Sequence, residues 1–366
     1  LRQSVCVMYA VRTVASPYLF QRDWQCKLSL QLMESGKALV NTLYLSPLFT
    51  PGSIALFGAS DREDSVGGIV FKNLRTSGFK GRIYAINPGR DVVQGEPAYK
   101  ALADIEETVD LAVVATPAQS IPAIVRACGE SGTRMMLILS AGFRETGAKG
   151  RALEDRVTQV AAHYGIRIMG PNCLGIIRPD IGLNATFGNN DAQAGNLALV
   201  SQSGAICTAI LDWAAVNKIG FSSVVSTGIA ADLDFGDYLD YLTTDPKTKA
   251  ILLYIEGVYD ARRFMSSLRA AARVKPVIAL KVGRHAAGAE ASASHTGALV
   301  GSDDTFSAAL SRSGVLRVET VGQLFSAARA LAANQHRRRS ERLVIITNGG
   351  GPGVMAADRA VDQDIE

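Results

Sequence analysis

From residue 53 onward, short runs of β-branched and other apolar residues alternate with amphipathic stretches of helical length. This alternation is typical of βαβ units, in which a crossover helix joins two parallel strands. We therefore predict an α/β fold. The strands predicted for the first series are residues 54–57, 82–86, 111–115, 135–139 and 167–169, and its helices are residues 66–77, 119–131 and 148–164. Pro122 fits only the first turn of a helix, so we expect that helix to begin close to it.

A second series of the same kind follows residues 182–195, a stretch rich in Asn, Gly and Ala. This stretch has no apolar period, so we place a domain boundary there. The predicted strands are residues 197–200, 222–225, 250–255, 277–281 and 316–318, and the predicted helices are residues 205–217, 260–273, 303–313 and 321–333. After the polar stretch 334–342, a third unit opens with a strand at 343–347 and a glycine-rich turn.

The two ends of the chain depart from this rhythm. We interpret residues 1–45 as an irregular extension, and the three arginines and absent acids of residues 1–22 leave a transit-type leader as the less favoured alternative. The chain stops inside a predicted helix, which indicates a fragment of a longer protein.

Composition argues against several classes of protein. The longest apolar runs have five to six residues, too few to span a membrane. The 5 cysteines form no CxxC pair, which argues against a zinc cluster and a disulfide framework and is typical of the reducing cytoplasm. We expect no metal site in these residues. The net charge of +4 comes with no basic stripe interleaved with aromatics, so we do not expect nucleic-acid binding.

The turn after the first predicted strand is a candidate anion site. Gly58, Ala59 and Ser60 follow the strand, and a helix opens at Val66. Such a turn presents amide N–H groups and a positive helix end to an anion, although a plain βα turn remains an alternative. NAD is not the expected ligand, because the GxGxxG fingerprint is absent and Asn87 and Pro88 stand where an acid would bind the ribose.

Other strand ends of this series carry the residues that a crevice for an extended, phosphate-bearing ligand needs. Thr116 and Pro117 follow one strand, and Ser140-Ala141-Gly142 follow another. Asn172, at the end of the series, offers a side-chain amide to a ligand. We interpret its neighbour Cys173 as a buried packing residue rather than a nucleophile, because no histidine motif accompanies it.

Among the 4 histidines, His295 has the most suggestive surroundings. It lies in the loop ASASHTGALVG, whose small residues would leave the imidazole exposed and able to reach reactants. A purely structural histidine remains the alternative. His163 and His336 are interpreted as structural or solvated, and His285 is ambiguous.

Two turns and one acid have chemistry that complements this imidazole. The sequences SQSG at 201–204 and GGGPG at 349–353 each follow a strand and open a helix, so each presents free N–H groups at a positive helix end. Two such ends converging on an imidazole would make a site for phosphohistidine. Glu256 follows the strand 250–255 and can hydrogen-bond one imidazole nitrogen, which leaves the other nucleophilic. An ordinary solvent-facing carboxylate is the alternative for Glu256.

Together these segments resemble the NDP-forming acyl-CoA synthetases of the acetate–CoA ligase type, which are relatives of succinyl-CoA synthetase. The matching stretches are residues 53–67, 82–88, 110–118, 139–143, 170–175, 197–205, 253–257, 292–301 and 347–353. The resemblance implies a Rossmann-like CoA-binding domain over 46–182 and a flavodoxin-like domain over 195–335. It also implies the start of a third, flavodoxin-like domain over 342–366.

The family reaction converts acyl-CoA, phosphate and ADP into acid, CoA and ATP through acyl phosphate and phosphohistidine. By resemblance, His295 is the phosphorylated residue and Glu256 its orienting partner. The implied phosphate-binding residues are Ser201, Gln202, Ser203, Gly204, Gly350, Gly351 and Gly353. The implied CoA-binding residues are Gly58, Ala59, Ser60, Asn87, Pro88, Thr116, Pro117 and Asn172.

One part of the family's machinery is missing from these residues. No ATP-grasp pattern occurs, so ADP or ATP with Mg²⁺ is expected only through an ATP-grasp domain, fused downstream or supplied as a separate subunit. The resemblance also implies an oligomer, and the acyl substrate has no recognisable code. Residues 210–220 and 237–263 look closest to a subgroup fused to a GNAT acetyltransferase, in which this region senses acyl-CoA. That alternative stays open, as does a CoA-binding redox or transcriptional module.

Overall fold

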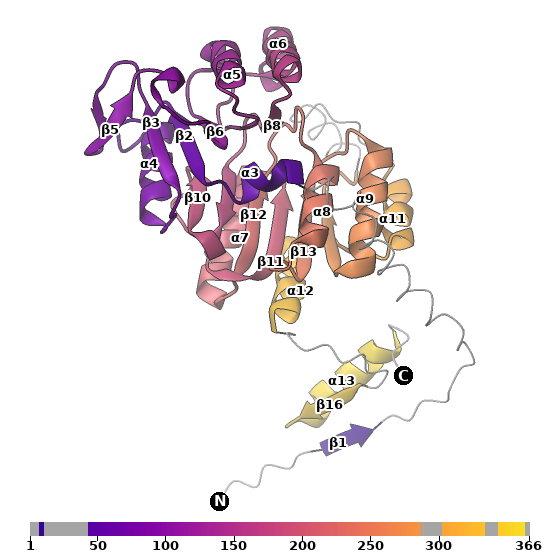
Figure 1. Ribbon diagram of the computed structural model, residues 1–366. Coiled ribbons are helices and arrows are strands. Elements are labelled where there is room, and N and C mark those ends of the chain that lie inside the picture. Colours follow the sequence, from indigo (N-terminus) through magenta and orange to yellow (C-terminus); the bar gives the residue numbers. More distant parts are fainter. Residues whose placement is uncertain (1–6, 11–42, 286–287, 289–301, 334–342, 363–366) are drawn as a thin grey trace, which may run out of the picture. The chain divides into compact units, whose positions relative to one another are not determined.

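The structure is a computed structural model that describes residues 7–10, 43–285, 288, 302–333 and 343–362. Contacts within the chain divide it into two units, which we describe separately. The larger comprises residues 39–333 and the smaller comprises residues 1–38 with 334–366. Two seven-stranded sheets lie in the larger unit (Figure 1).

The first sheet is parallel except at one edge. Its strand order is β4 (Val92–Val93), β5 (Glu96–Tyr99), β3 (Arg82–Ile86), β2 (Ser53–Phe57), β6 (Leu111–Val114), β7 (Met135–Ile138) and β8 (Arg167–Met169). Only β4 runs antiparallel, to β5. The chain passes from β2 to β3 on one side and later to β6 on the other. The carboxyl ends of β2 and β6 therefore form a topological switch point, where α/β proteins bind ligands.

Helices cover both faces of this sheet. The longer ones are α4 (Val66–Thr76), α5 (Ile121–Glu130) and α6 (Ala148–Tyr164), and the short α3 (Ser46–Phe49) precedes β2. Ser65 caps α4 by accepting a hydrogen bond from the Gly68 N–H at 3.1 Å. Pro122 lies in the first turn of α5, which confirms the predicted start of that helix. We call this sheet with its helices the first lobe.

The second sheet contains a five-strand parallel core. Its order is β10 (Leu183–Thr186), β9 (Gly175–Arg178), β12 (Phe221–Ser226), β11 (Ala194–Ser201), β13 (Ala250–Ile255), β14 (Val277–Lys281) and β15 (Leu316–Val318). From β12 to β15 this is the flavodoxin-like order 2-1-3-4-5, with a switch point between β11 and β13. We call this sheet with its helices the second lobe.

The stretch 182–195, where the sequence predicted a domain boundary, contains the strand β10 that the sequence did not predict. The antiparallel hairpin of β9 and β10 belongs to the second sheet, because β9 pairs with β12. Both strands have only four residues and are fully buried, so neither shows an alternation of apolar and polar residues.

Two sets of helices enclose the second sheet. One face packs against α7 (Gly204–Asn217) and α12 (Val321–Ala333). The other packs against α8 (Phe235–Thr244), α9 (Ala261–Val274) and α11 (Asp303–Arg312), which lie side by side in Figure 1. One continuous apolar cluster includes Leu56 and Phe71 of the first lobe and Val200 and Phe264 of the second. The two lobes therefore share a core.

The predicted irregular extension over residues 1–45 also needs a correction. In the smaller unit, β1 (Val7–Ala10) pairs antiparallel with β16 (Val344–Thr347), which is followed by α13 (Gly350–Val361). In the larger unit, a short 3₁₀ helix occupies Leu43–Leu45.

Further 3₁₀ turns are Leu102–Asp104, Ala118–Ser120, Arg144–Thr146 and Pro179–Ile181. Among the described helices, none combines the length and apolarity that crossing a membrane requires.

Candidate functional site

The turn at residues 201–204 begins a helix at the switch point of the second sheet. Ser201 ends β11, and its hydroxyl accepts a hydrogen bond from the Ser203 N–H at 3.1 Å. The Ser203 hydroxyl in turn caps α7 by accepting from the Ile206 N–H at 3.4 Å. Among the described hydrogen bonds, none uses the N–H groups of Gly204 and Ala205. The start of α7 thus offers two donors at a positive helix end.

Glu256 lies beside this turn, as the predicted phosphate site requires. It directly follows β13, the neighbour of β11, and is buried with 8% of its surface exposed. The Gln202 side chain links the two strand ends, because its Oε1 accepts from the Glu256 N–H at 2.6 Å. Burial raises the pKa of the nearby Tyr254 to about 12, and the negative charge of Glu256 contributes to this shift.

The four residues of this turn, 201–204, differ in whether their main-chain N–H groups can still bind a phosphate. The Gln202 N–H donates to the Tyr254 carbonyl at 3.2 Å, and the Ser203 N–H is taken by Ser201. Neither group is a free donor. Of this set, the Gly204 N–H remains available to an anion, and Ala205 adds a donor that the sequence motif did not single out.

Charged residues that precede and follow the segment containing His295 in the sequence are paired with one another. His295 itself lies outside the described residues. Arg317 donates to the Asp303 carboxylate at 2.5 Å, and Arg284 pairs with Glu319 at 3.0 Å. Lys281 ends β14, is buried, and lies 5.5 Å from the Phe306 ring centroid. Burial lowers the pKa of Lys281. Sequence reasoning missed this group, although a lysine at the end of the buried run VIALK was a usable signal.

Two histidines lie within the described residues, and the surroundings of His163 fit its interpretation as structural or solvated. His163 lies on α6, exposed and edge-on to Tyr164. His285 is exposed. His336 lies outside the described residues.

In the first lobe, the glycine turn packs closely against the start of α4. Gly58 has φ +89°, and its N–H donates to the Ile86 carbonyl at 3.1 Å. A Cβ on Gly67 would lie 1.8 Å from the Gly58 carbonyl oxygen, so only glycine allows this approach. Ala59 is buried, and the Ser60 hydroxyl accepts from the Arg62 N–H at 3.1 Å. The predicted strand–glycine–helix turn is thus formed, and its binding of an anion stays a prediction.

Asn87 holds this turn against the end of β3. Its Nδ2 donates to the Ala59 carbonyl at 2.8 Å, and its Oδ1 accepts from the Gly89 N–H at 2.9 Å. Both hydrogen-bonding groups of the Asn87 amide are therefore engaged with main-chain groups of the protein. Pro88 and Pro117 are exposed, Pro88 two residues and Pro117 three residues after the ends of β3 and β6.

Hydrogen bonds join Thr116 and Asn172 through Ser140. The Ser140 hydroxyl donates to the Thr116 carbonyl at 2.5 Å, and the Asn172 N–H donates to the Ser140 carbonyl at 3.0 Å. Asn172 has the unusual φ of +53°. Cys173 is buried and its Sγ contacts the Ile138 carbonyl at 3.4 Å, while burial raises the pKa of its thiol. These contacts confirm that Cys173 is a packing residue.

The segment 226–231 connects the two predicted sites, and sequence reasoning missed it. The Thr227 N–H donates to the Ser201 carbonyl at 2.8 Å, and the Ile229 N–H donates to the Pro171 carbonyl at 2.9 Å. Gly228 has φ +58°, and a Cβ there would lie 2.5 Å from the Asn172 carbonyl oxygen. The end of the predicted CoA crevice is therefore one short segment away from the start of α7. The letters STG after a buried strand were the available signal.

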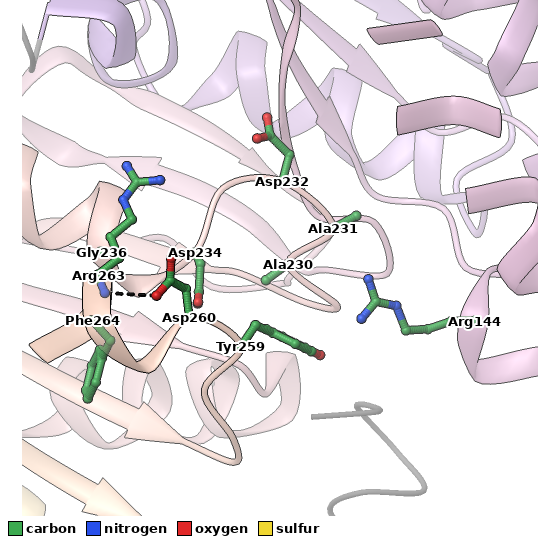
Figure 2. A pocket seen from close by; sticks show the side chains of 10 residues that line it. All are labelled: Arg144, Ala230, Ala231, Asp232, Asp234, Gly236, Tyr259, Asp260, Arg263 and Phe264. Carbon is green, nitrogen blue, oxygen red and sulfur yellow. Dashed lines mark hydrogen bonds between the residues drawn. The ribbon is translucent and has the colours of Figure 1, made fainter. Parts of the chain in front are cut away.

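A cavity of about 300 Å³ opens between the lobes next to this segment. Figure 2 shows Arg144 of the first lobe pointing toward Tyr259 of the second, with Asp234 and Arg263 farther across the cavity. The Arg144 guanidinium lies 5.2 Å from the Tyr259 ring centroid and pairs with Glu154. Asp260 accepts from the Arg263 N–H at 2.9 Å, and the charged groups that line the cavity have similar partners: Asp232 with Arg167, Asp234 with Phe235 N–H, and Arg263 with Asp237. Both arginines that line the cavity are therefore already paired with carboxylates.

Two protein families match the two lobes. The family described as "CoA binding domain" matches residues 52–179, and the family described as "Succinyl-CoA ligase like flavodoxin domain" matches residues 194–331. The chain is also 44% identical over 325 residues to the α subunit of ADP-forming acetate–CoA ligase I of Pyrococcus furiosus, covering 88% of this chain and 70% of that subunit. The chain belongs to the ADP-forming acetate–CoA ligase family. The predicted α/β fold, with a Rossmann-like and a flavodoxin-like part, is confirmed.

Further members of this family differ in how much of them the chain spans. ADP-forming acetate–CoA ligase I of Archaeoglobus fulgidus is 45% identical over 316 residues, which are 86% of this chain but only 45% of that protein. A solved structure of the dinucleotide-forming acetyl-coenzyme A synthetase 1 of Ca. Korarchaeum cryptofilum, in complex with phosphate and ADP, superposes with a TM-score of 0.83 at 38% identity. That match covers 88% of this chain and 69% of the other.

The second predicted helix terminus of this ligase family lies in the smaller unit. Gly349 precedes α13, and its N–H donates to the Thr347 hydroxyl at 3.2 Å. A Cβ on Gly350 or Gly351 would meet no atom within 4 Å, whereas one on Gly353 would lie 3.1 Å from Thr347. The turn thus has the predicted strand–glycine–helix form. Its convergence with the turn at 201–204 stays a prediction.

Proposed function

We propose that this chain is the part of an ADP-forming acetate–CoA ligase that binds acyl-CoA and carries phosphohistidine. The overall reaction is acyl-CoA + phosphate + ADP giving acid, CoA and ATP. The observation that carries the proposal is the junction of the α7 start with Glu256 through Gln202, at the flavodoxin switch point. Family membership and the glycine turn at residues 58–60, which packs closely against the start of α4, support the same function.

In the first step, phosphate displaces CoA from the acyl group. A phosphate oxygen attacks the thioester carbonyl, the C–O bond forms as the C–S bond breaks, and CoA leaves as a thiolate that takes up a proton. The N–H groups of Gly204 and Ala205 would bind phosphate oxygens at the positive end of α7. CoA would occupy the crevice lined by residues 58–60, 87–88, 116–117 and Asn172, which ends at the segment 226–231.

In the second step, His295 takes the phosphoryl group. One imidazole nitrogen attacks phosphorus, the N–P bond forms as the bond from phosphorus to the acyl oxygen breaks, and the carboxylate leaves. Glu256 would accept a hydrogen bond from the other nitrogen and stabilise the positive charge that develops on the ring. The turn at Gly350, Gly351 and Gly353 would supply the second helix terminus for the phosphoryl group.

The remaining part of the reaction needs a partner. We propose an ATP-grasp domain or subunit that binds ADP with Mg²⁺ and receives the phosphoryl group, in a cytoplasmic oligomer. The Pyrococcus furiosus relative is itself named as a subunit. The acyl-CoA-sensing alternative, with a fused GNAT domain, gains no support from the relatives reported above, which are named as ligases or synthetases.

The proposal is tested by incubating the chain with acetyl-CoA and radiolabelled inorganic phosphate. We expect protein-bound label that survives base and is lost in acid, as a phosphohistidine would be. His295→Ala should abolish the label. His285→Ala is the matched control, because His285 is an exposed histidine ten residues earlier, and it should keep the label. Label that persists in His295→Ala, or none in the unaltered chain, would overturn the proposal.

A further inference from the structure

We infer that Gln202 is a positioning residue that holds Glu256 in register with the start of α7, a role that rests on the proposed function. The family resemblance placed Gln202 among the phosphate-binding residues. Its contacts instead point to the main chain beside Glu256. Gln202 would thus act on the reaction through Glu256 rather than by touching phosphate.

Three hydrogen bonds tie the Gln202 side chain to the end of β13. Its Oε1 accepts from the Glu256 N–H at 2.6 Å and from the Gly257 N–H at 3.0 Å. Its Nε2 donates to the Gly257 carbonyl at 2.9 Å. The side chain therefore binds the peptide groups on both sides of Gly257. These bonds fix the main chain at Glu256 and with it the direction of the Glu256 Cα–Cβ bond.

These contacts also determine the orientation of the amide. Turning it over would place Nε2 against two N–H donors and Oε1 against the Gly257 carbonyl, so only one orientation makes all three bonds. Gln202 is 4% exposed, and its main-chain N–H is bonded to the Tyr254 carbonyl at 3.2 Å. A buried side chain that is engaged in this way has little surface to offer a phosphate.

The two ends of this link have different neighbours. Gln202 lies between Ser201, which accepts from the Thr227 N–H, and Ser203, which caps α7. Glu256 follows the adjacent strand. A change in the link would therefore move the carboxylate relative to the N–H groups of Gly204 and Ala205. A displacement of about 1 Å can cost about 10²-fold in rate when reacting groups must be aligned.

The test is a double-mutant cycle with Gln202→Ala, Glu256→Gln and the double variant, in the full chain. The initial rate of labelling by radiolabelled phosphate and acetyl-CoA is measured at saturating and limiting acetyl-CoA. We expect Glu256→Gln to lower the maximal rate by about 10²–10⁴-fold. We expect Gln202→Ala to lower it by about 10²-fold with an unchanged KM for acetyl-CoA, because the CoA crevice lies in the other lobe.

The double variant decides between the two roles. If Gln202 acts through Glu256, the double variant should match Glu256→Gln within about a factor of two. A purely structural or phosphate-binding role predicts that the two losses multiply, and that result would overturn the inference. If Gln202→Ala does not fold, as judged by thermal unfolding, Gln202→Met keeps the side-chain volume and takes its place in the cycle.

A matched control and a separate readout complete the design. Gln323 also accepts from two main-chain N–H groups, those of Glu319 at 2.7 Å and Thr320 at 3.3 Å, but is exposed at the start of α12. Gln323→Ala should leave the labelling rate within about a factor of two. If His295→Ala or Glu256→Gln retains full labelling, the proposed function fails. If both lose labelling but the Gln202 and Glu256 losses multiply, only the role of Gln202 fails.

Discussion

At the scale of single residues, the same polar side chain can serve a ligand or the protein itself. Gln202 and Asn87 both follow predicted strands, and the resemblance assigns both to ligands. The structure engages their amides with main-chain groups 54 and 28 positions away in the sequence. No local pattern reveals a partner at such a distance. Cys173 was easier to interpret, because an isolated cysteine with no histidine motif beside it is usually a buried packing residue.

Gly228 offers a residue-scale prediction about the segment that joins the two sites. Its φ is +58°, and a Cβ at this position would lie 2.3 Å from the Pro171 carbonyl oxygen, so both features disfavour a side chain. Gly314 has φ +72° but open space around its Cβ position, so Gly314→Ala measures backbone strain alone, about 1–2 kcal/mol. Gly228→Ala should lose about 1–3 kcal/mol more, because main-chain oxygens cannot move aside easily. Urea unfolding of both variants checks this, and equal losses would contradict the close contact.

At the scale of elements, most parallel strands of the two large sheets were predictable from the sequence, whereas β4, β5, β9 and β10 were not. The parallel strands β2, β6, β7 and β13 are continuous apolar runs, which a sequence displays directly. The helix α8 escaped prediction, although its buried residues Phe235, Tyr238, Leu239 and Leu242 follow a helical period. Asp234 and Asp237, which form its capping box, resemble loop residues when no partner is known.

The candidate site was likewise predictable only in part. The glycine turn at residues 58–60 and the start of α7 were predictable, because a strand, a small-residue turn and a helix follow one another locally. The segment 226–231 and the charged group around Asp303 depend on strand order, which places β12 beside β11 and β15 beside β14. Strand order emerges only from the assembled sheet.

The start of α11 provides an element-scale prediction about pH. The hydrogen bond from Arg317 lowers the pKa of Asp303. A carboxyl whose folded pKa is lowered contributes stability above its unfolded pKa, near 3.9, and loses it as the pH falls through the folded pKa. Asp303→Asn should therefore be less stable than the unaltered chain at pH 7, and the difference should vanish in strong acid.

Urea unfolding at neutral and acid pH measures this difference. Asp304→Asn is the control, because Asp304 is an exposed carboxylate in the same first turn and no ion pair to it occurs among the described contacts. Its effect should be the smaller at pH 7. A difference for Asp303→Asn that is the same at every pH would contradict an electrostatic origin.

At the scale of the larger unit, a polar seam supplements the apolar core that the two lobes share. Arg167, on the edge strand β8, donates to Asp232 at 2.9 Å and to Asp237 at 3.2 Å. The Leu233 N–H also donates to the Ile168 carbonyl at 3.1 Å, so the second lobe covers the open edge of the first sheet. Tyr44 joins the seam through its hydrogen bond to Asp237, and burial above all raises its pKa to about 12.

This seam lies next to the segment 226–231, which joins the two predicted sites. Breaking the ion pairs of the seam should therefore increase local opening near that segment. Arg167→Met would leave Asp232 without its guanidinium, while Asp237 would keep Arg263. We expect faster amide hydrogen exchange in β8 and in residues 229–233, with the central strands β11 and β13 unchanged, since local opening needs only the seam to break. Mass spectrometry of exchange resolves these segments.

The control is Arg75→Met, which removes an ion pair to Glu96, 2.5 Å long, that lies wholly within the first lobe. This variant should leave residues 229–233 as protected as before. Equal exchange at 229–233 in both variants would mean that the shared apolar core alone, and not the Arg167 seam, holds the lobes together.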